Sequence, residues 1–239
     1  MADEFQSQLM GYDRASILFS PEGRIFQVEY AEKTVRLGAS SIGFTCKDGV
    51  VIVADKRVED KLLVLGSLWK AYEIDDHIIA SSAGILSDAR VLIERAQVYA
   101  QQHRVTYNDD VDVESVAREI ANIAQAYTQY GGVRPFGVEL MFAGINPDNS
   151  KKLFVVDVTG NYNAYYTTAI GEFDEKIKEI LRREYNKNMS VDDCIKLGLK
   201  IFKRLLGKNF NYERMDVVFV REDERKAKRL GIEELKKLI

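Results

Sequence analysis

The sequence predicts an α+β fold in which two antiparallel sheets are packed between pairs of helices. Strand patterns occur in hairpin-like groups, and two long helix patterns follow each group instead of alternating with single strands. This order buries every apolar face if the sheets stack and the helices cover them. No linker-like stretch interrupts the 239 residues. We therefore expect one domain over 1–239, with a flexible tail at 1–11, a turn and helix at 20–38 and the sandwich at 39–239.

The first structured element is expected within GYDRASILFSPEGRIFQVEYA, residues 11–31. The run SPEG at 20–23 carries serine, proline and glycine at positions that favour a type I turn. An amphipathic helix pattern follows over 24–37, and Gly38 is expected to end it. Chain ends are usually expendable, so the concentration of charged and aromatic residues here needs an explanation.

The rest of the chain supplies the sandwich. Strand patterns are expected at 40–46, 50–56, 70–74, 77–83, 137–145, 153–158, 163–170 and 215–220. Helix patterns are expected at 86–104, 111–130, 173–185, from 191 onward and at 231–239. Lys47-Asp48-Gly49 and Asp75-Asp76 are interpreted as hairpin turns, and Ser190 with Asp193 as a capping box.

Composition narrows the possible functions. The chain has 34 basic and 37 acidic residues and a net charge of −3, which argues against a nucleic-acid partner. Only RKAKR at 225–229 is locally basic, and it is interpreted as a solvated helix face. The N-terminus lacks the apolar core of a signal peptide, and no apolar run is long enough for a membrane span. Two cysteines without a CxxC motif fit a cytoplasmic protein without a disulfide framework.

The residues that could carry metal or nucleophilic chemistry are few. The two histidines, His77 and His103, lie in no recognisable metal or Ser-His-Asp motif. Asp75 and Asp76 are interpreted as turn formers and not as metal ligands. No phosphate-binding loop or dinucleotide motif is present. We therefore expect neither a cofactor nor a metal.

The run YDRASILFSPEGRIFQVEYA resembles the N-terminal motif of proteasome α-type subunits, particularly the archaeal ones. Three further stretches agree in the same order: KDGVVIVADKRV, SDARVLIERAQ and YTQYGGVRPFGVELMFAGI. The resemblance implies the four-layer αββα sandwich of N-terminal nucleophile hydrolases, with an extra N-terminal helix. It also implies a seven-membered ring that forms the outer, non-catalytic layer of the 20S core particle.

In the catalytic relatives, the nucleophile is a threonine that is exposed when a propeptide is removed. By the resemblance, Ala39 stands at that position, and alanine has no nucleophilic atom. Asp55 and Lys70 resemble the acidic and basic partners, but they have no nucleophile to activate. Ser40 and Ser41 could be proposed as substitutes, although the sequence favours ordinary strand residues, because neither has a free amine without cleavage. No catalytic residue is expected.

The resemblance also assigns a gate cluster, which holds the N-terminal tails aside when the axial pore opens. Its residues here are Tyr12, Asp13, Arg14, Pro21 and Tyr30. A tyrosine hydroxyl can donate a strong hydrogen bond to a carboxylate such as that of Asp13, and Pro21 fixes the backbone of the turn. The alternative is that the YDR run only stabilises a surface turn.

Four residues resemble the pocket between neighbouring α-subunits that receives the C-terminal carboxylate of an activator ATPase: Ile25, Glu29, Gly38 and Lys70. The alternative for Lys70 is a solvated lysine at a strand start. Trp69 and Glu32 depart from the residues that the family commonly carries, and Glu172-Phe173 stands where Gly-Ser-Gly is common after Gly171.

Tyr130, Gly131 and Gly132 resemble the loop that lines the entrance below the gate, with a helix end as the alternative. The implied partners are other α-subunits, β-subunits, activator ATPases and unfolded protein, without nucleic acid or membrane. Two other functions remain open. One is a self-processed hydrolase beginning at Ala39 or Ser40, and the other is a free-standing ring used as a scaffold.

Overall fold

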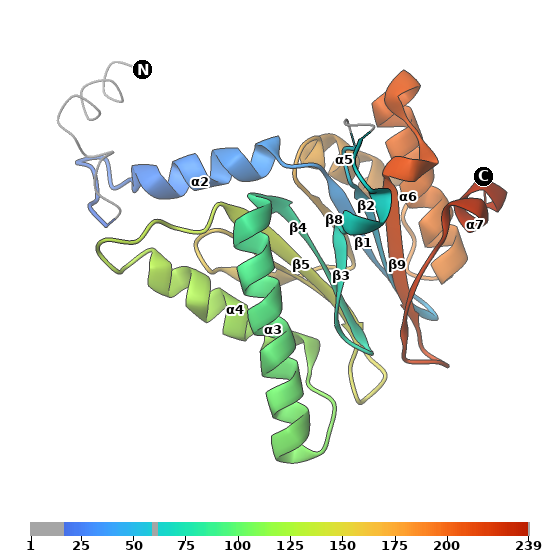
Figure 1. Ribbon diagram of the computed structural model, residues 1–239, viewed down its shortest axis with the longest axis horizontal. Helices are drawn as coiled ribbons and strands as arrows, with labels where there is room; N and C mark the ends of the chain where they lie inside the picture. Colours follow the sequence, from blue (N-terminus) through green and yellow to red (C-terminus); the bar gives the residue numbers. More distant parts are fainter. Residues whose placement is uncertain (1–16, 59–61, 239) are drawn as a thin grey trace.

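The computed structural model describes residues 17–58 and 62–238, and this part forms two five-stranded sheets that stack between helices (Figure 1). The strand order is β10-β9-β2-β1-β8 in one sheet and β3-β4-β5-β6-β7 in the other, with antiparallel pairing throughout. The strands are β1 (Ser41–Cys46), β2 (Gly49–Asp55), β3 (Ala71–Asp75), β4 (Ile78–Gly84), β5 (Val138–Ile145), β6 (Lys151–Val156), β7 (Tyr162–Ala164), β8 (Thr167–Ile170), β9 (Met215–Arg221) and β10 (Ala227–Arg229). The helices are α2 (Phe26–Leu37), α3 (Leu86–Tyr107), α4 (Val113–Tyr127), α5 (Asp174–Glu184), α6 (Val191–Leu206) and α7 (Ile232–Lys237). The predicted α+β fold of antiparallel sheets and flanking helices is confirmed.

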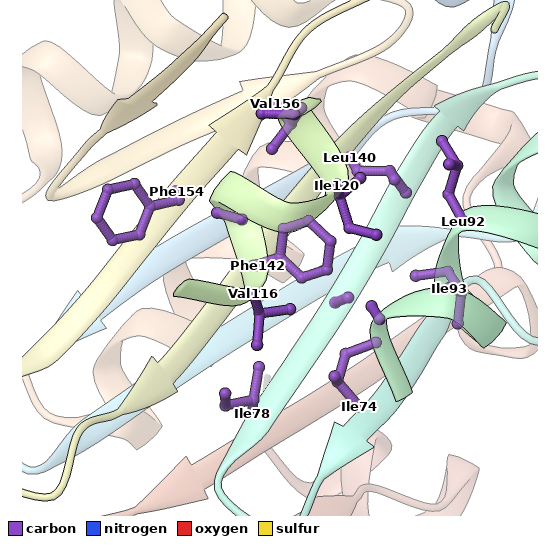
Figure 2. Packing of buried hydrophobic residues seen from close by; sticks show 14 of the residues in the cluster. Ile74, Ile78, Leu92, Ile93, Val116, Ile120, Leu140, Phe142, Phe154 and Val156 are labelled. Atoms are coloured by element: carbon purple, nitrogen blue, oxygen red, sulfur yellow. The ribbon is translucent and has the colours of Figure 1, made fainter. Parts of the chain in front are cut away.

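Apolar clusters hold four layers together. Figure 2 shows Leu92 and Ile93 of α3, with Val116 and Ile120 of α4, packed over Phe142 of β5. A second cluster joins α5 and α6 to the other sheet, and a third lies between the two sheets. Both faces of each sheet are therefore covered. This explains why β1 and β2 are buried along their whole length instead of at alternate residues.

Helix α2 lies against the ends of β4 and β5, outside the four layers (Figure 1). It begins two residues later than predicted, because Ile25 is extended, with φ −108° and ψ 101°. Its apolar stripe is buried and consists of Phe26, Val28, Ala31 and Val35. This stripe attaches the N-terminal helix to the sandwich.

The predicted strand at 163–170 is divided between the two sheets. Strand β7 pairs with β6, whereas β8 pairs with β1. Tyr165 donates its N–H to Leu153 O at 2.8 Å in one sheet, while Tyr166 O accepts the N–H of Thr45 at 2.8 Å in the other. A single strand was the wrong prediction, because the chain crosses between the stacked sheets at these two tyrosines.

The basic run at 225–229 is not the predicted helix face. Its last three residues form β10, which pairs with β9 at the edge of a sheet. The guanidinium of Arg229 is ion-paired with the buried Asp216 and donates to Ala71 O at 2.7 Å. This basic side chain therefore serves an internal contact, which helical spacing alone did not reveal.

The other sequence signals are placed close to where they were expected. The capping box is confirmed, because Asp193 N–H donates to Ser190 Oγ at 3.2 Å and Ser190 N–H donates to Asp193 Oδ2 at 3.1 Å. Asp75 ends β3, so the tight turn consists of residues 76–77. Within 17–58 and 62–238, no helix has both the length and the apolar character needed to cross a membrane.

Candidate functional site

The junction between α2 and β1 places Gly38 beside the end of β4, and Gly38 and Ala39 beside Gly171, which follows β8. Gly38 N–H donates to Val35 O at 2.9 Å, and Gly38 O accepts the N–H of Glu172 at 2.7 Å. The φ of Gly38 is −70°, which any residue can adopt. Glycine is nevertheless required, because a Cβ here would lie 2.2 Å from the backbone nitrogen of Gly84. The predicted helix end is confirmed, and its cause is a close approach of two backbone segments.

The hydroxyl groups next to Ala39 are buried and engaged in internal hydrogen bonds. Ser40 Oγ donates to the backbone oxygen of Glu172. Ser41 Oγ lies 2.7 Å from Ser81 Oγ, which donates to Lys70 O at 2.7 Å. These contacts are those of structural serines, and they support the ordinary interpretation of Ser40 and Ser41.

Asp55 is paired with an arginine that the sequence did not single out. Arg214 donates from Nε to Asp55 Oδ1 at 2.9 Å and from Nη2 to Oδ2 at 2.6 Å. The N–H of Arg57 also donates to Asp55 Oδ1, at 2.9 Å. The carboxylate that resembles a catalytic acid is thus occupied by a two-pronged ion pair, which fixes its orientation.

Lys70 is buried, with 4% of its surface exposed, so the interpretation of a solvated lysine is wrong. Its backbone N–H donates to Asp216 Oδ2 at 2.9 Å. Burial lowers the pKa of the Lys70 ammonium to about 8, Asp55 opposes this shift, and Arg57 adds to it. In the described part of the chain, no carboxylate oxygen lies within 4 Å of the ammonium. The cation is therefore poorly compensated within one chain.

The departures Glu172 and Phe173 have structural consequences. The Glu172 carboxylate is ion-paired with Arg57, whose Nη1 donates to Leu37 O at 3.0 Å. This contact joins the end of α2 to the loops after β2 and β8. Phe173 has φ +64°, in the left-handed region that suits glycine better than a bulky aromatic residue. The aromatic residue therefore carries backbone strain at the start of α5.

The departure at Glu32 contributes to an acidic cavity of about 280 Å³ between α2 and α5. Glu139, Asp157 and Asp174 also line it. Burial raises the pKa of Glu139 to about 7, and the neighbouring carboxylates of Asp174, Asp157 and Glu32 push it in the same direction, while Lys178 opposes them. Glu32 thus adds a negative charge to a cavity in which neighbouring carboxylates already make the ionised form of Glu139 unfavourable.

The turn before α2 has the predicted type I hydrogen bond, from Gly23 N–H to Ser20 O at 2.8 Å. Gly23 has φ +77°, and Pro21 is exposed at the tip. Tyr30 lies half-buried on α2, with its ring centroid 6.4 Å from that of Phe26. The other predicted gate residues, Tyr12, Asp13 and Arg14, lie outside the described residues.

The predicted activator-pocket residues come from both ends of α2 and from the start of β3. Ile25 and Glu29 adjoin through the Glu29 N–H, which donates to Ile25 O at 3.3 Å. The hydrogen bond from Arg24 Nε to Glu29 Oε1, at 2.5 Å, lowers the pKa of Glu29. Gly38 follows the far end of the 12-residue helix, which is about 18 Å long, and Lys70 lies beside β9.

Trp69, beside Lys70, is half-exposed and lies under the guanidinium of Arg229 at 4.1 Å from the ring centroid. A cation over an indole face is a favourable arrangement. The departure at Trp69 therefore places a large aromatic surface next to the buried lysine.

The predicted pore loop follows the end of α4. Tyr130 is exposed, and its N–H donates to Ala126 O at 3.1 Å, while Gly132 has φ +86°. A Cβ on Gly131 would lie 3.6 Å from Ile17 Cδ1, so the loop adjoins the beginning of the described chain. In Figure 1 the loop after α4 and the segment before α2 lie at the same end of the molecule.

The loop is anchored by a contact that the sequence did not predict. Arg134 donates to both oxygens of Asp88, at 2.6 and 2.8 Å, and the N–H of Gly137 donates to Asp88 Oδ2 at 2.9 Å. Thr34 Oγ1 in turn donates to Gly137 O at 3.1 Å. Helices α2 and α3 and the loop are thus joined around Gly137. The only sequence signal for this contact was that Asp88 and Arg134, which carry opposite charges, lie in two of the stretches that resemble the family.

The two stacked antiparallel sheets between helices are consistent with the sandwich of N-terminal nucleophile hydrolases. Residues 35–220 match the family model for proteasome subunits, and residues 12–33 match the model for the N-terminal signature of A-type proteasome subunits. The chain belongs to the proteasome subunit family and is of the α type.

Relatives that are named as alpha subunits of the proteasome match along most of their length. The chain is 45% identical to that of Archaeoglobus fulgidus over 95% of this chain and 92% of the relative. It is 43% identical to that of Methanocaldococcus jannaschii, over 95% of this chain and 87% of the relative. It is 40% identical to that of Methanosarcina mazei, over 96% of this chain and 92% of the relative.

Proposed function

We propose that the chain is a non-catalytic subunit of the outer ring of a 20S proteasome core and forms its gated axial entrance. The observation that carries this proposal is the surroundings of Ala39. By the resemblance, Ala39 with its methyl group stands at the position of the nucleophile, and the hydroxyls of the following Ser40 and Ser41 are used in internal hydrogen bonds. Peptide-bond cleavage then belongs to partner β-subunits. The whole chain, 1–239, acts as one domain in the cytoplasm.

The proposed gate is supported by a contact between the first described residue and the predicted pore loop. Ile17, the first described residue, adjoins Gly131 of the predicted pore loop. The described chain therefore begins beside the loop that we propose lines the entrance. The turn at Pro21 sets the direction in which the chain leaves α2, and Tyr30 with Tyr12, Asp13 and Arg14 holds the tail aside when the gate is open.

Activator docking is supported by the electrostatics of Lys70. A buried ammonium without a close carboxylate gains from an anionic ligand, and the C-terminal carboxylate of an activator ATPase supplies one. Ile25 and Gly38 flank the two ends of α2, about 18 Å apart, which is too far for both to contact one carboxylate. The pocket therefore forms only between two neighbours in a closed, seven-membered ring.

Co-expression with β-subunits tests the proposal. We expect a stacked-ring complex by native mass spectrometry, which hydrolyses peptides and loses this activity when the catalytic threonine of the β-subunits is replaced. The intact mass of this chain in the complex should be that of the full-length polypeptide. A mature chain beginning at Ala39 or Ser40 would favour the self-processed hydrolase. A ring that never assembles with β-subunits would favour the scaffold.

A further inference from the structure

The turn between β3 and β4 brings a histidine and two carboxylates together at the opposite end of β3 from Lys70. We propose that His77, Asp75 and Asp110 form a binding site for a divalent transition-metal ion such as Zn²⁺. Their ligand atoms all lie within 4.8 Å of one another. In the sequence Asp75 is interpreted only as a turn former, and Asp110, which is 35 residues further along the chain and follows α3, is not singled out.

The hydrogen bond of His77 determines which ring nitrogen faces the site. His77 Nε2 lies 2.8 Å from Val111 O, and a carbonyl oxygen can only accept. Nε2 therefore carries the hydrogen, and in the neutral ring Nδ1 presents a lone pair. Metal-binding histidines commonly donate their other ring N–H to a backbone carbonyl in this way. His77 is thus held in the tautomer that a metal site needs.

Two buried acceptors face each other across the proposed site. His77 Nδ1 and Asp75 Oδ2 have no hydrogen-bond partner among the described residues, and their side chains are 1% and 2% exposed. Leaving such groups buried without a partner is unfavourable, because each gives up its hydrogen bonds to water without replacement. The two atoms are 3.9 Å apart, which is too far for a hydrogen bond. A zinc ion with ligand distances of about 2.0–2.2 Å spans a gap of this size.

Asp110 supplies the third ligand from the loop between α3 and α4. Its side chain is 35% exposed, so it lies at the rim and can move onto an ion, whereas Asp75 and His77 are fixed. Its exposure also provides an access route from solvent and an open position for water. One imidazole and two carboxylates form a donor set that suits Zn²⁺ and similar metals.

Two arginines limit the affinity of the site. Arg104 Nη2 lies 2.9 Å from Asp75 Oδ1 and 3.0 Å from Asp110 Oδ1, and Arg225 Nη2 lies 3.5 Å from Asp110 Oδ2. They hold the carboxylates but also compete with a cation for their charge. Calcium and magnesium depend on carboxylate charge and gain little from imidazole. We therefore expect zinc and cobalt to bind in preference to either.

Metal titration of the tag-free, full-length protein, in the ring or complex in which it is purified, tests the proposal. After chelator treatment, we expect one Zn²⁺ per chain by elemental analysis, visible absorption from bound Co²⁺, and a rise in melting temperature with added Zn²⁺. His77→Gln should lose all three responses. His103→Gln, which removes the other and partly exposed histidine, should retain them.

A variant of the partly exposed Asp110 keeps the test decisive if His77→Gln folds poorly. Asp110→Asn leaves the buried pair in place and should weaken Zn²⁺ binding by at least about tenfold without preventing folding. Three results would overturn the proposal: no zinc bound by the wild-type chain, equal binding by wild type and His77→Gln, or unchanged affinity in Asp110→Asn.

Discussion

The Asp88 carboxylate accepts two hydrogen bonds from the Arg134 guanidinium and thereby joins the first turn of α3 to the loop after α4. These hydrogen bonds lower the pKa of Asp88, and Gly137 N–H contributes in the same direction. The two residues are 46 positions apart, in separate stretches that resemble the family motifs. Their contact determines where the predicted pore loop lies on the sandwich.

Replacing Asp88 by asparagine should lower the free energy of unfolding by about 1 kcal/mol, because charged hydrogen bonds to Arg134 and Gly137 are lost. The effect is kept small by the 57% exposure of the Arg134 side chain. Chemical denaturation measures it. The matched control is Arg90→Gln, which removes an exposed ion pair with Glu94 inside α3 and should cost less than about 0.5 kcal/mol. Equal losses in the two variants would contradict this role.

The same pair predicts a pH dependence. The folded chain lowers the pKa of Asp88 below its ordinary value of 3.8, so the unfolded state binds its proton first. The stabilisation is therefore complete above that ordinary value and is lost as the pH falls through the lower folded value. The stability difference between wild type and Asp88→Asn should shrink in acid. A difference that stays constant as the pH falls below 3.8 would contradict the ion pair.

The buried Lys70 predicts a pH dependence of the same sign, but at high pH and from an unfavourable burial of charge instead of a favourable ion pair. Its pKa is about 8 in the folded chain against 10.5 ordinarily, so the unfolded state binds more protons between these values. Stability should therefore rise with pH across this window, relative to Lys70→Met. The change corresponds to on the order of 3 kcal/mol. Denaturation curves from pH 7 to pH 10 provide the measurement, with the exposed Lys196→Met as control. Parallel pH profiles for wild type and Lys70→Met would show that the ammonium is not desolvated.

Lys70 also carries the docking proposal. In assembled particles, Lys70→Ala should abolish the stimulation of peptide hydrolysis by an activator ATPase, because the carboxylate of its tail loses the cation. The measured quantity is the ratio of stimulated to unstimulated rate within each variant. Lys196→Ala, on an exposed face of α6, should keep the wild-type ratio. Retained stimulation in Lys70→Ala would remove Lys70 from the pocket.

Phe173 offers a test of stored backbone strain. Its φ of +64° favours glycine, so Phe173→Gly should be more stable than Phe173→Ala by about 1 kcal/mol. Both variants remove the aromatic ring and its contact with Lys176, 5.7 Å from the ring centroid, so their difference isolates the backbone. Thermal unfolding of the two proteins gives this difference. If the alanine variant is equally or more stable, the left-handed conformation is not retained in solution.

Sequence patterns predicted correctly those features that depend only on residues close together in the chain. The capping box at Ser190 and the turn at 20–23 depend on residues within one turn of chain, and both were found. The strand at 163–170 was predicted as one piece, because nothing in its composition marks the crossing at Tyr165 and Tyr166. That crossing depends on pairing with β1 and β6, which are distant in sequence.

The properties of the candidate site depend even more than the strands on contacts between residues that are distant in sequence. The burial of Lys70 follows from packing beside Asp216, and the orientation of Asp55 follows from Arg214, 159 residues away. Motif resemblance located the residues, but it did not show which charges are compensated. Only the assembled sheets bring Asp75 and His77 together with Asp110 from the other end of α3.

The most direct test of the gated entrance is the deletion of residues 1–11 in particles assembled with β-subunits. Degradation of an unfolded protein should become several-fold faster than in wild-type particles without an activator, because the tails no longer obstruct the pore. Hydrolysis of a short peptide, which needs a smaller opening, should rise less. An unchanged rate of protein degradation, in particles shown to be intact by native mass spectrometry, would contradict a gate formed by this chain.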